Sequence, residues 1–168
     1  MNAAGLTPGD VLAILDEVKD PEVPVLSVVE LGIVRDVQLD RGGVTVTITP
    51  TYSGCPAMRV IEEEITAALE ARGLSPVSLK TVYAPAWTTE WLSDEAKKKL
   101  ERYGIAPPGA ARQETLITLT RSPASESPPC PYCGSRNTEL RSEFGSTACK
   151  SICYCRACEQ PFEAFKAL

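Results

Sequence analysis

The stretches Cys-Pro-Tyr-Cys-Gly at residues 130–134 and Cys-Arg-Ala-Cys at residues 155–158 decide the fold of the C-terminal part of this chain. Each holds a C-x2-C pair, which offers two thiolates from one tight turn. Two such turns facing each other complete a tetrahedral all-sulfur metal site. The 21 residues between the two pairs are one more than the usual window, a difference that a longer hairpin absorbs. The spacing predicts a zinc ribbon with four ligands: Cys130, Cys133, Cys155 and Cys158.

The ion should also supply the folding energy of this segment, because a chain of about 40 residues buries too little apolar surface to fold alone. Sets of four cysteines bind either zinc or an iron–sulfur cluster. The compact paired turns favour zinc, and a visible absorption spectrum would distinguish the two.

Two further cysteines, Cys149 and Cys153, lie on the arm that leads into the second pair. Four thiolates satisfy one tetrahedral ion, so these two are surplus. They are either small hydrophobic residues on a strand or auxiliary thiols that exchange with the primary ligands during metal loading. The two turns also differ, because Gly134 follows the first pair whereas Glu159 follows the second. The second turn should therefore be strained or differently shaped.

Length and composition are those of one ordinary domain with a small appendage: 168 residues, of which 43% are hydrophobic. No apolar run resembles a signal peptide or a membrane span, so we expect a cytoplasmic protein that does not engage a membrane. Thiols stay reduced in that compartment. The odd number of seven cysteines therefore favours metal binding over a disulfide framework.

The charge of the tail argues against nucleic acid as a partner. Residues 130–168 carry five basic and four acidic side chains, and a zinc ion with four thiolates adds two negative charges. A ribbon that binds nucleic acid needs a positive face to displace counterions from phosphates.

The chain has no histidine. This absence removes the 2-His-1-carboxylate iron site, the Rieske ligands and every catalytic triad that uses imidazole. We therefore expect no catalytic activity from this chain alone.

Residues 1–121 predict a small α+β domain of about four strands and three helices. Helices are expected from Thr7 to before Pro21, from Pro56 to Gly73 and from Ser93 to Gly104, with apolar stripes at helical spacing. Strands are expected at 28–39 and 44–49, which form a hairpin, and at 77–83 and 115–120. Residues 122–129 are rich in Ser and Pro and predict a linker. The zinc ribbon, built of β-hairpins, then occupies 130–168.

Three residues of the first domain are candidates for a second site. Asp20 and Glu22 lie in a proline-rich acidic loop that either connects two elements or presents its carboxylates to a partner or a metal. Pro56 at the first helical position places Cys55 at the N-cap, where the helix dipole lowers a thiol pKa. The alternative for Cys55 is a small buried residue. The loop with Trp87 and Trp91 either covers the core or forms a groove wall near Cys55.

Three motifs together resemble known families: Asp-Pro-Glu-Val-Pro-Val at 20–25, Thr-Pro-Thr-Tyr-Ser-Gly-Cys-Pro at 49–56, and Phe-Gly-Ser-Thr-Ala-Cys-Lys at 144–150. The first two resemble the SufT-like domain of metal–sulfur cluster biosynthesis. Combined with the third motif and a zinc ribbon, they are similar to the D-subunit family of phenylacetyl-CoA epoxidases, also called phenylacetate-CoA oxygenase subunit PaaJ. The resemblance covers nearly the whole chain. Cys153 and Glu159 depart from it, since an aromatic or aliphatic residue and a glycine are expected there.

The resemblance implies an accessory subunit of a multicomponent oxygenase that epoxidises the ring of phenylacetyl-CoA in aerobic phenylacetate breakdown. The iron chemistry would belong to another subunit, and this chain would mature or insert an iron or iron–sulfur centre there. Cys55, Asp20 and Glu22 of this chain match the positions suspected to be functional in that family. The implied partners are the other oxygenase subunits and iron–sulfur assembly proteins. Two alternatives stay open, a purely structural subunit of the oxygenase and a general factor for iron–sulfur cluster assembly.

Overall fold

The computed structural model describes residues 6–40, 43–109 and 127–167. The described residues fall into two compact units. The N-terminal unit runs to Trp87 and includes Trp91–Ala96, and the C-terminal unit comprises Thr88–Glu90 and the residues from Lys97 onward. The predicted strand 115–120 and most of the predicted linker 122–129 lie outside the described residues. The division into domains 1–121 and 130–168 therefore stays a prediction.

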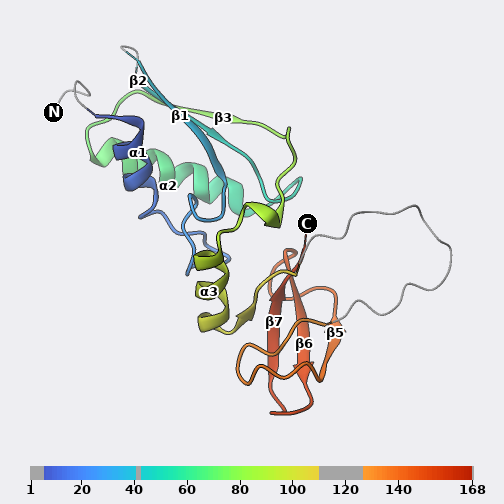
Figure 1. Ribbon diagram of the computed structural model, residues 1–168. Helices are drawn as coiled ribbons and strands as arrows, with labels where there is room; N and C mark the ends of the chain where they lie inside the picture. Colours follow the sequence, from blue (N-terminus) through green and yellow to red (C-terminus); the bar gives the residue numbers. More distant parts are fainter. Residues whose placement is uncertain (1–5, 41–42, 110–126, 168) are drawn as a thin grey trace. The chain divides into compact units, whose positions relative to one another are not determined.

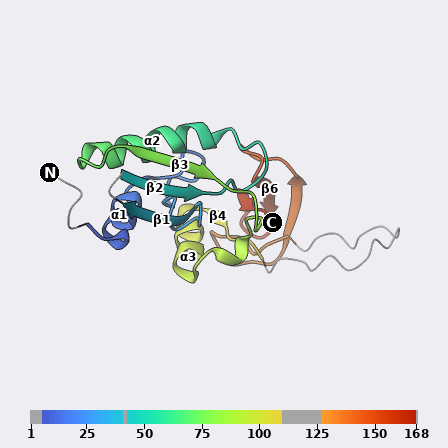
Figure 2. The ribbon, with the colours of Figure 1, turned by 90° about the horizontal axis from the view of Figure 1, so that it is seen from above.

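The N-terminal unit is a three-stranded sheet with two helices. Strands β1 (Val34–Asp40) and β2 (Gly43–Ile48) pair antiparallel, with Val37 opposite Val46. Strand β3 (Val77–Thr81) then pairs parallel with β2, so the order is β1-β2-β3. Helix α1 (Pro8–Leu15) packs beside α2 (Ala57–Ala71) (Figures 1 and 2). The core lies between helices and sheet, where Leu15, Val46, Ile48, Ile61 and Ile65 are fully buried.

Local sequence signals explain the helix ends. The Thr7 hydroxyl accepts the Asp10 N–H, and the Asp10 carboxylate accepts the Thr7 N–H, so the predicted N-cap forms a full capping box. This contact lowers the pKa of Asp10. Helix α2 begins one residue later than predicted, since Pro56 occupies the N-cap and no side chain caps this end. The prediction of Cys55 as the N-cap is therefore wrong by one position.

One predicted strand is also wrong in part. Residues 28–33 form a turn, and β1 begins only at Val34. The Ser27 hydroxyl accepts the Glu30 N–H at 2.9 Å, and the Glu30 carboxylate accepts the Ser27 N–H at 3.0 Å. This reciprocal pair closes a turn that Gly32 ends with a φ of 71°. Side-chain bonds of this kind compete with a strand ladder.

The C-terminal unit is a four-stranded sheet in the order β4-β7-β6-β5. Strands β5 (Thr138–Ser142), β6 (Lys150–Cys155) and β7 (Pro161–Phe165) form the antiparallel ribbon. The short strand β4 (Ile105–Ala106) follows helix α3 (Asp94–Tyr103) and pairs parallel with β7. Strand β4 is not among the predicted elements. The ribbon sheet thus includes a strand that precedes the first cysteine pair by more than twenty residues.

The ring of Tyr132 in the first cysteine turn packs against Gly104, which ends α3. Gly104 has a φ of 91°, and a Cβ there would lie 2.8 Å from the Tyr132 hydroxyl. This contact and the β4–β7 pairing fasten the end of α3 to the ribbon. No helix within the described ranges is long and apolar enough to cross a bilayer.

Candidate metal centre and thiol loop

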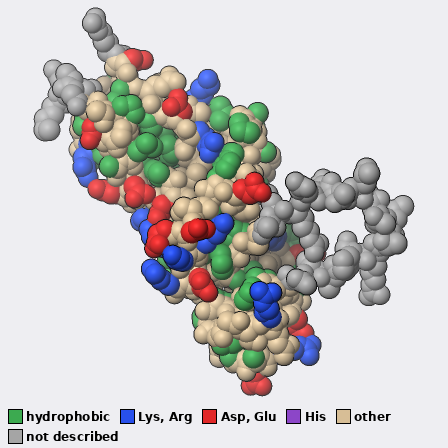
Figure 3. Space-filling model, in the orientation of Figure 1, with side chains coloured by type: hydrophobic (Ala, Val, Ile, Leu, Met, Phe, Trp, Pro, Cys, Tyr) green, Lys and Arg blue, Asp and Glu red, His purple; other side chains and the backbone are tan. Residues whose placement is uncertain are grey.

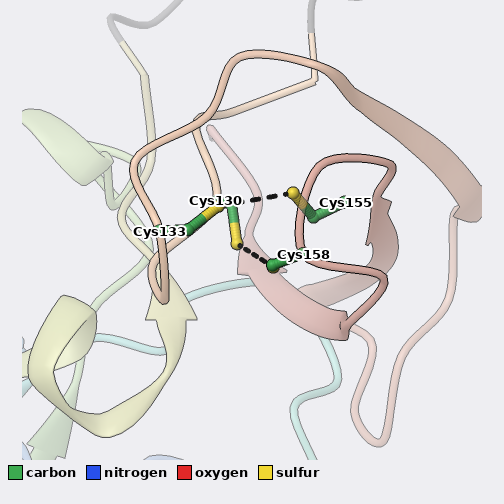
Figure 4. Close-up of side chains that lie close together, drawn as sticks. All are labelled: Cys130, Cys133, Cys155 and Cys158. Atoms are coloured by element: carbon green, nitrogen blue, oxygen red, sulfur yellow. Dashed lines mark hydrogen bonds between the residues drawn. The ribbon is translucent and has the colours of Figure 1, made fainter.

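The four predicted ribbon cysteines come together at one end of the C-terminal sheet (Figure 4). Their sulfur atoms all lie within 4.8 Å of one another. The Cys130 and Cys158 sulfurs are 3.7 Å apart, and those of Cys133 and Cys155 are 3.6 Å apart. A tetrahedral zinc with Zn–S bonds of about 2.3 Å needs sulfur–sulfur edges of about 3.8 Å. The donor set therefore fits a tetrahedral four-thiolate ion, and no cysteine of the chain is in a disulfide.

The two cysteine turns share one backbone pattern. The Cys130 N–H donates to the Ser135 carbonyl at 2.9 Å, and the Cys155 N–H donates to the Gln160 carbonyl at 2.9 Å. Each turn then needs a left-handed residue. Gly134 takes a φ of 71° in the first turn, and Glu159 takes a φ of 57° in the second. The predicted strain is thus located at Glu159, the only non-glycine residue of the described part with a positive φ.

The thiols of the cluster differ in acidity. The backbone N–H of Cys158, followed by that of Ala157, outweighs desolvation and lowers the pKa of Cys155 to about 6. Burial, together with the neighbouring thiols, raises the pKa of Cys158 to about 12. The Cys155 thiol is therefore more acidic than the Cys158 thiol. Metal binding at such a site releases protons.

The two auxiliary cysteines are buried. Cys153 lies in the small core beneath the cluster, beside Ala106, Phe162 and Ala164. Burial raises the pKa of the Cys153 thiol and keeps it neutral. Cys149 lies 3.1 Å from the Thr147 hydroxyl. Neither belongs to the four-sulfur group, and their exchange with the ligands stays a prediction.

Three segments of the N-terminal unit meet at one end of its sheet. Val34, Ile48 and Thr81 are paired neighbours across the three strands. The turn of residues 28–33 leads into this end, and the Cys55 loop and the segment that begins at Val82 leave from it. The Thr49 N–H donates to the Ile33 carbonyl at 2.9 Å, and the Val82 N–H donates to the Ile48 carbonyl at 2.8 Å. These bonds place the Cys55 loop at the carboxyl ends of the parallel strands β2 and β3, where open sheets commonly bind ligands.

The candidate residues of the N-terminal unit have different surroundings. Cys55 is partly exposed in the turn that precedes α2. Asp20 is only 6% exposed, and its Oδ1 accepts the Glu22 N–H at 2.8 Å and the Val23 N–H at 2.7 Å. Within the described residues, the only group of three or more potential ligands that converges within 4.8 Å is that of the ribbon cysteines. The structure thus does not bring Cys55, Asp20 and Glu22 together in this way.

The tryptophan segment covers the core. Trp87 is 5% exposed, and its Nε1 donates to the Leu31 carbonyl at 2.7 Å. The Arg35 guanidinium stacks over the Trp91 ring, 3.7 Å from its centroid. The interpretation of Trp87 as a core lid is confirmed.

Comparison with known proteins matches two parts of the chain to two different families. Residues 9–78 match the family described as "Iron-sulfur cluster assembly protein", and residues 117–166 match the "PaaD zinc beta ribbon domain". An Escherichia coli (strain K12) protein, described as the D-subunit of a "Putative 1,2-phenylacetyl-CoA epoxidase", is 41% identical over 160 residues, which are 95% of this chain and 92% of that protein. This chain belongs to the D-subunit family of phenylacetyl-CoA epoxidases. The resemblance noted from the sequence is confirmed.

The N-terminal part has shorter relatives of its own. A "Fe-S protein maturation auxiliary factor" of Porphyromonas gingivalis is 35% identical over 96 residues, 56% of this chain and 90% of that protein. The crystal structure of a "Domain of Unknown Function DUF59" from Bacillus anthracis shares 30% identity with a TM-score of 0.52. It matches 55% of this chain and 90% of its own length. This fold therefore occurs without the ribbon.

Two features of the C-terminal unit are not predicted from the sequence. One is the pairing of β4 with β7. The other is an ion pair between Lys150 and Glu163, whose Nζ and Oε2 lie 2.9 Å apart. Lys150, Ile152 and Tyr154 share one face of β6. Glu163 is paired with Ile152, so the register of β6 and β7 places Lys150 and Glu163 on the same face.

Proposed function

We propose that this chain is an accessory factor that matures or inserts an iron or iron–sulfur centre in another subunit of a phenylacetyl-CoA epoxidase. In this proposal Cys55 holds the iron cargo transiently, and the Asp20 and Glu22 carboxylates assist it when cargo or client is bound. The four ribbon cysteines hold a structural zinc, and the ribbon docks the factor onto its client. The factor acts in the cytoplasm, with iron–sulfur assembly proteins as its source of cargo.

One contrast carries the proposal. The ribbon supplies all four ligands of a closed site, whereas Cys55 is a partly exposed thiol at the carboxyl ends of β2 and β3. A structural metal site is closed by protein ligands, while a site that exchanges a ligand keeps positions open. The family supports the same division, since relatives of the N-terminal part are named as maturation factors for iron–sulfur proteins.

The charges of the ribbon favour a protein partner over nucleic acid. Acidic and basic side chains are interspersed within each unit on the face shown in Figure 3. On the ribbon, both Arg141 and Arg156 pair with Glu139, which neutralises part of their charge. Binding to phosphates needs basic groups that are available to displace counterions.

The test replaces Cys55 with serine and co-expresses the variant with the remaining epoxidase subunits. The expected result is unchanged thermal unfolding and ribbon zinc content, with the iron content and epoxidase activity of the client lowered at least tenfold. Ser53→Ala, an exposed position in the same loop, is the matched control. Full client activity with Cys55→Ser removes Cys55 from the mechanism.

A structural subunit is the second candidate, favoured by the description of the Escherichia coli relative as a subunit. It requires stable, stoichiometric co-purification with the oxygenase and activity that depends on the continued presence of this chain. A maturation factor, by contrast, is dispensable once the client is loaded. Removing the chain from an active, loaded enzyme separates the two.

A further inference from the structure

The loop of residues 143–149 connects β5 to β6 and carries a largely exposed aromatic ring. The Phe144 side chain is 67% exposed. We call residues 143–149 the Phe144 loop. The roles considered so far do not involve the Phe144 side chain.

Backbone contacts fix the shape of the Phe144 loop. The Gly145 N–H donates to the Lys150 carbonyl at 2.8 Å, and the Lys150 N–H donates to the Thr147 carbonyl at 3.2 Å. The Ser142 hydroxyl donates to the Phe144 carbonyl at 2.8 Å and accepts the Phe144 N–H at 3.2 Å. The loop therefore presents its ring on an ordered backbone.

The ion pair between Lys150 and Glu163 contacts the Phe144 loop. The Lys150 side chain is only 5% exposed, and its ammonium lies 2.9 Å from the Glu163 carboxylate. The other oxygen of Glu163 accepts the Ser146 N–H at 2.9 Å. The loop packs closely on this pair, because a Cβ on Gly145 would lie 3.1 Å from the Glu163 oxygen. The Lys150 end of this pair is buried, whereas Glu163 is 29% exposed. Loss of the carboxylate would leave a buried ammonium without its partner, so the pair holds the geometry of the loop.

A cation lies beside the exposed ring. The Lys166 ammonium is 4.5 Å from the centroid of the Phe144 ring and donates to the Ala148 carbonyl at 2.8 Å. The Lys166 N–H donates to the Cys149 carbonyl at 2.9 Å, so the backbone that carries this lysine is tied to the same loop. Ring and ammonium therefore lie side by side on the loop.

Single exposed apolar residues are ordinary on protein surfaces. Phe144 differs because several hydrogen bonds and an ion pair with the buried Lys150 hold the loop that carries it. A rigid aromatic anchor loses little conformational entropy on binding, and such anchors dominate the binding energy of protein interfaces.

We propose that the Phe144 loop is a preformed docking anchor for a protein partner. The Phe144 ring enters an apolar pocket of the partner, and a carboxylate at the rim of that pocket pairs with Lys166. The inference deepens the proposed function and rests on it for the partner, which is an epoxidase subunit whose metal centre this chain serves.

The experiment titrates the full-length, metal-loaded chain with the purified remaining epoxidase subunits and measures the dissociation constant by calorimetry. Phe144→Ala should raise the constant at least tenfold, while Phe144→Leu retains part of the affinity. Lys166→Glu should raise it about as much, by placing like charges together. Tyr83→Ala is the matched control, since Tyr83 is also 67% exposed but lies in the N-terminal unit, and it should change the constant less than twofold.

Ribbon zinc content and thermal unfolding of each variant separate docking from folding, and both should stay at wild-type values for Phe144→Ala. Undiminished binding by Phe144→Ala, with a wild type that binds, overturns the docking anchor and leaves the proposed function standing. A wild type that binds no epoxidase subunit overturns both. Self-association of the wild type that Phe144→Ala abolishes also overturns the proposal, because the ring would then be a contact between copies of this chain.

Discussion

The ribbon cluster and the proposed Cys55 site differ in how many ligands the protein brings together. In the ribbon, four sulfurs converge within 4.8 Å, on two turns with the same backbone pattern. In the N-terminal unit Cys55 is partly exposed, and Asp20 uses its carboxylate to shape its own loop. A protein that retains a metal closes the coordination sphere itself. A site that passes a metal on needs positions for the donor and for the client.

Removal of the metal tests this contrast with the largest expected effect. Structural zinc contributes about 10 kcal/mol or more to the folding of small ribbons. Chelation under reducing conditions should therefore abolish hydrogen-exchange protection in β4 to β7 and preserve it in β1 to β3. Cys155→Ser should do the same, whereas Cys149→Ser should keep a full complement of metal. Protection that persists in β6 and β7 after elemental analysis confirms metal loss would show that the ribbon does not depend on the ion.

The Lys150–Glu163 pair is the second support of the C-terminal unit. Glu163→Gln should lower the free energy of unfolding by about 2 to 3 kcal/mol, because a buried ammonium loses its carboxylate partner. Burial acts to raise the pKa of Glu163, but the hydrogen bonds from Ser146 and Lys150 hold it below its ordinary value of 4.5.

The sign of this pKa shift fixes the pH dependence. A depressed folded-state pKa contributes stability above the unfolded value, and this stability is lost as the pH falls through the folded pKa. The stability difference between wild type and Glu163→Gln should be full above about pH 5 and shrink below about pH 4. Chemical denaturation at several pH values measures it. A difference that stays constant through this range contradicts the assignment.

Substitutions of Asp20 test the N-terminal unit, with a smaller expected change in stability. Its carboxylate accepts two backbone N–H groups, so Asp20→Ala should cost about 1 to 2 kcal/mol of stability. Asp20→Asn keeps an acceptor oxygen and should cost less than about 1 kcal/mol. If the charge also serves the iron cargo, Asp20→Asn lowers client maturation while leaving thermal unfolding nearly intact. Wild-type maturation by Asp20→Asn confines Asp20 to the shape of the loop.

Local sequence signals predict much of this molecule. The C-x2-C pairs identify the four ribbon residues because each turn is built from adjacent residues, and the Thr7 cap and the Val44–Ile48 alternation are equally local. Local sequence signals also led to a wrong prediction, the strand over residues 28–33. Val28 and Val29 resemble the start of a strand, but the Ser27–Glu30 bonds close a turn there instead.

Non-local contacts account for what the sequence did not show. Strand β4 has two residues and no pattern of its own, and it forms because β7 offers an edge. The sequence alone does not show a partner for Lys150, because Glu163 pairs with Ile152, two pairs along the ladder from Lys150. The surroundings of Cys55 and Asp20 likewise depend on how β1, β2 and β3 pair.

The two cysteine turns allow the test with the smallest expected effect. They share one backbone conformation, but Gly134 occupies the left-handed position in the first turn and Glu159 in the second. A side chain at positive φ costs about 1 kcal/mol relative to glycine. Glu159→Gly should therefore strengthen metal retention against a competing chelator by up to about fivefold, with part of the gain offset by the greater freedom of glycine in the unfolded chain. Gly134→Ala should weaken retention by a similar factor, since a Cβ there meets nothing within 4 Å and only the backbone term changes. Opposite shifts in the two variants would place the strain at Glu159, whereas a loss of retention in Glu159→Gly would show that the glutamate side chain itself supports the site.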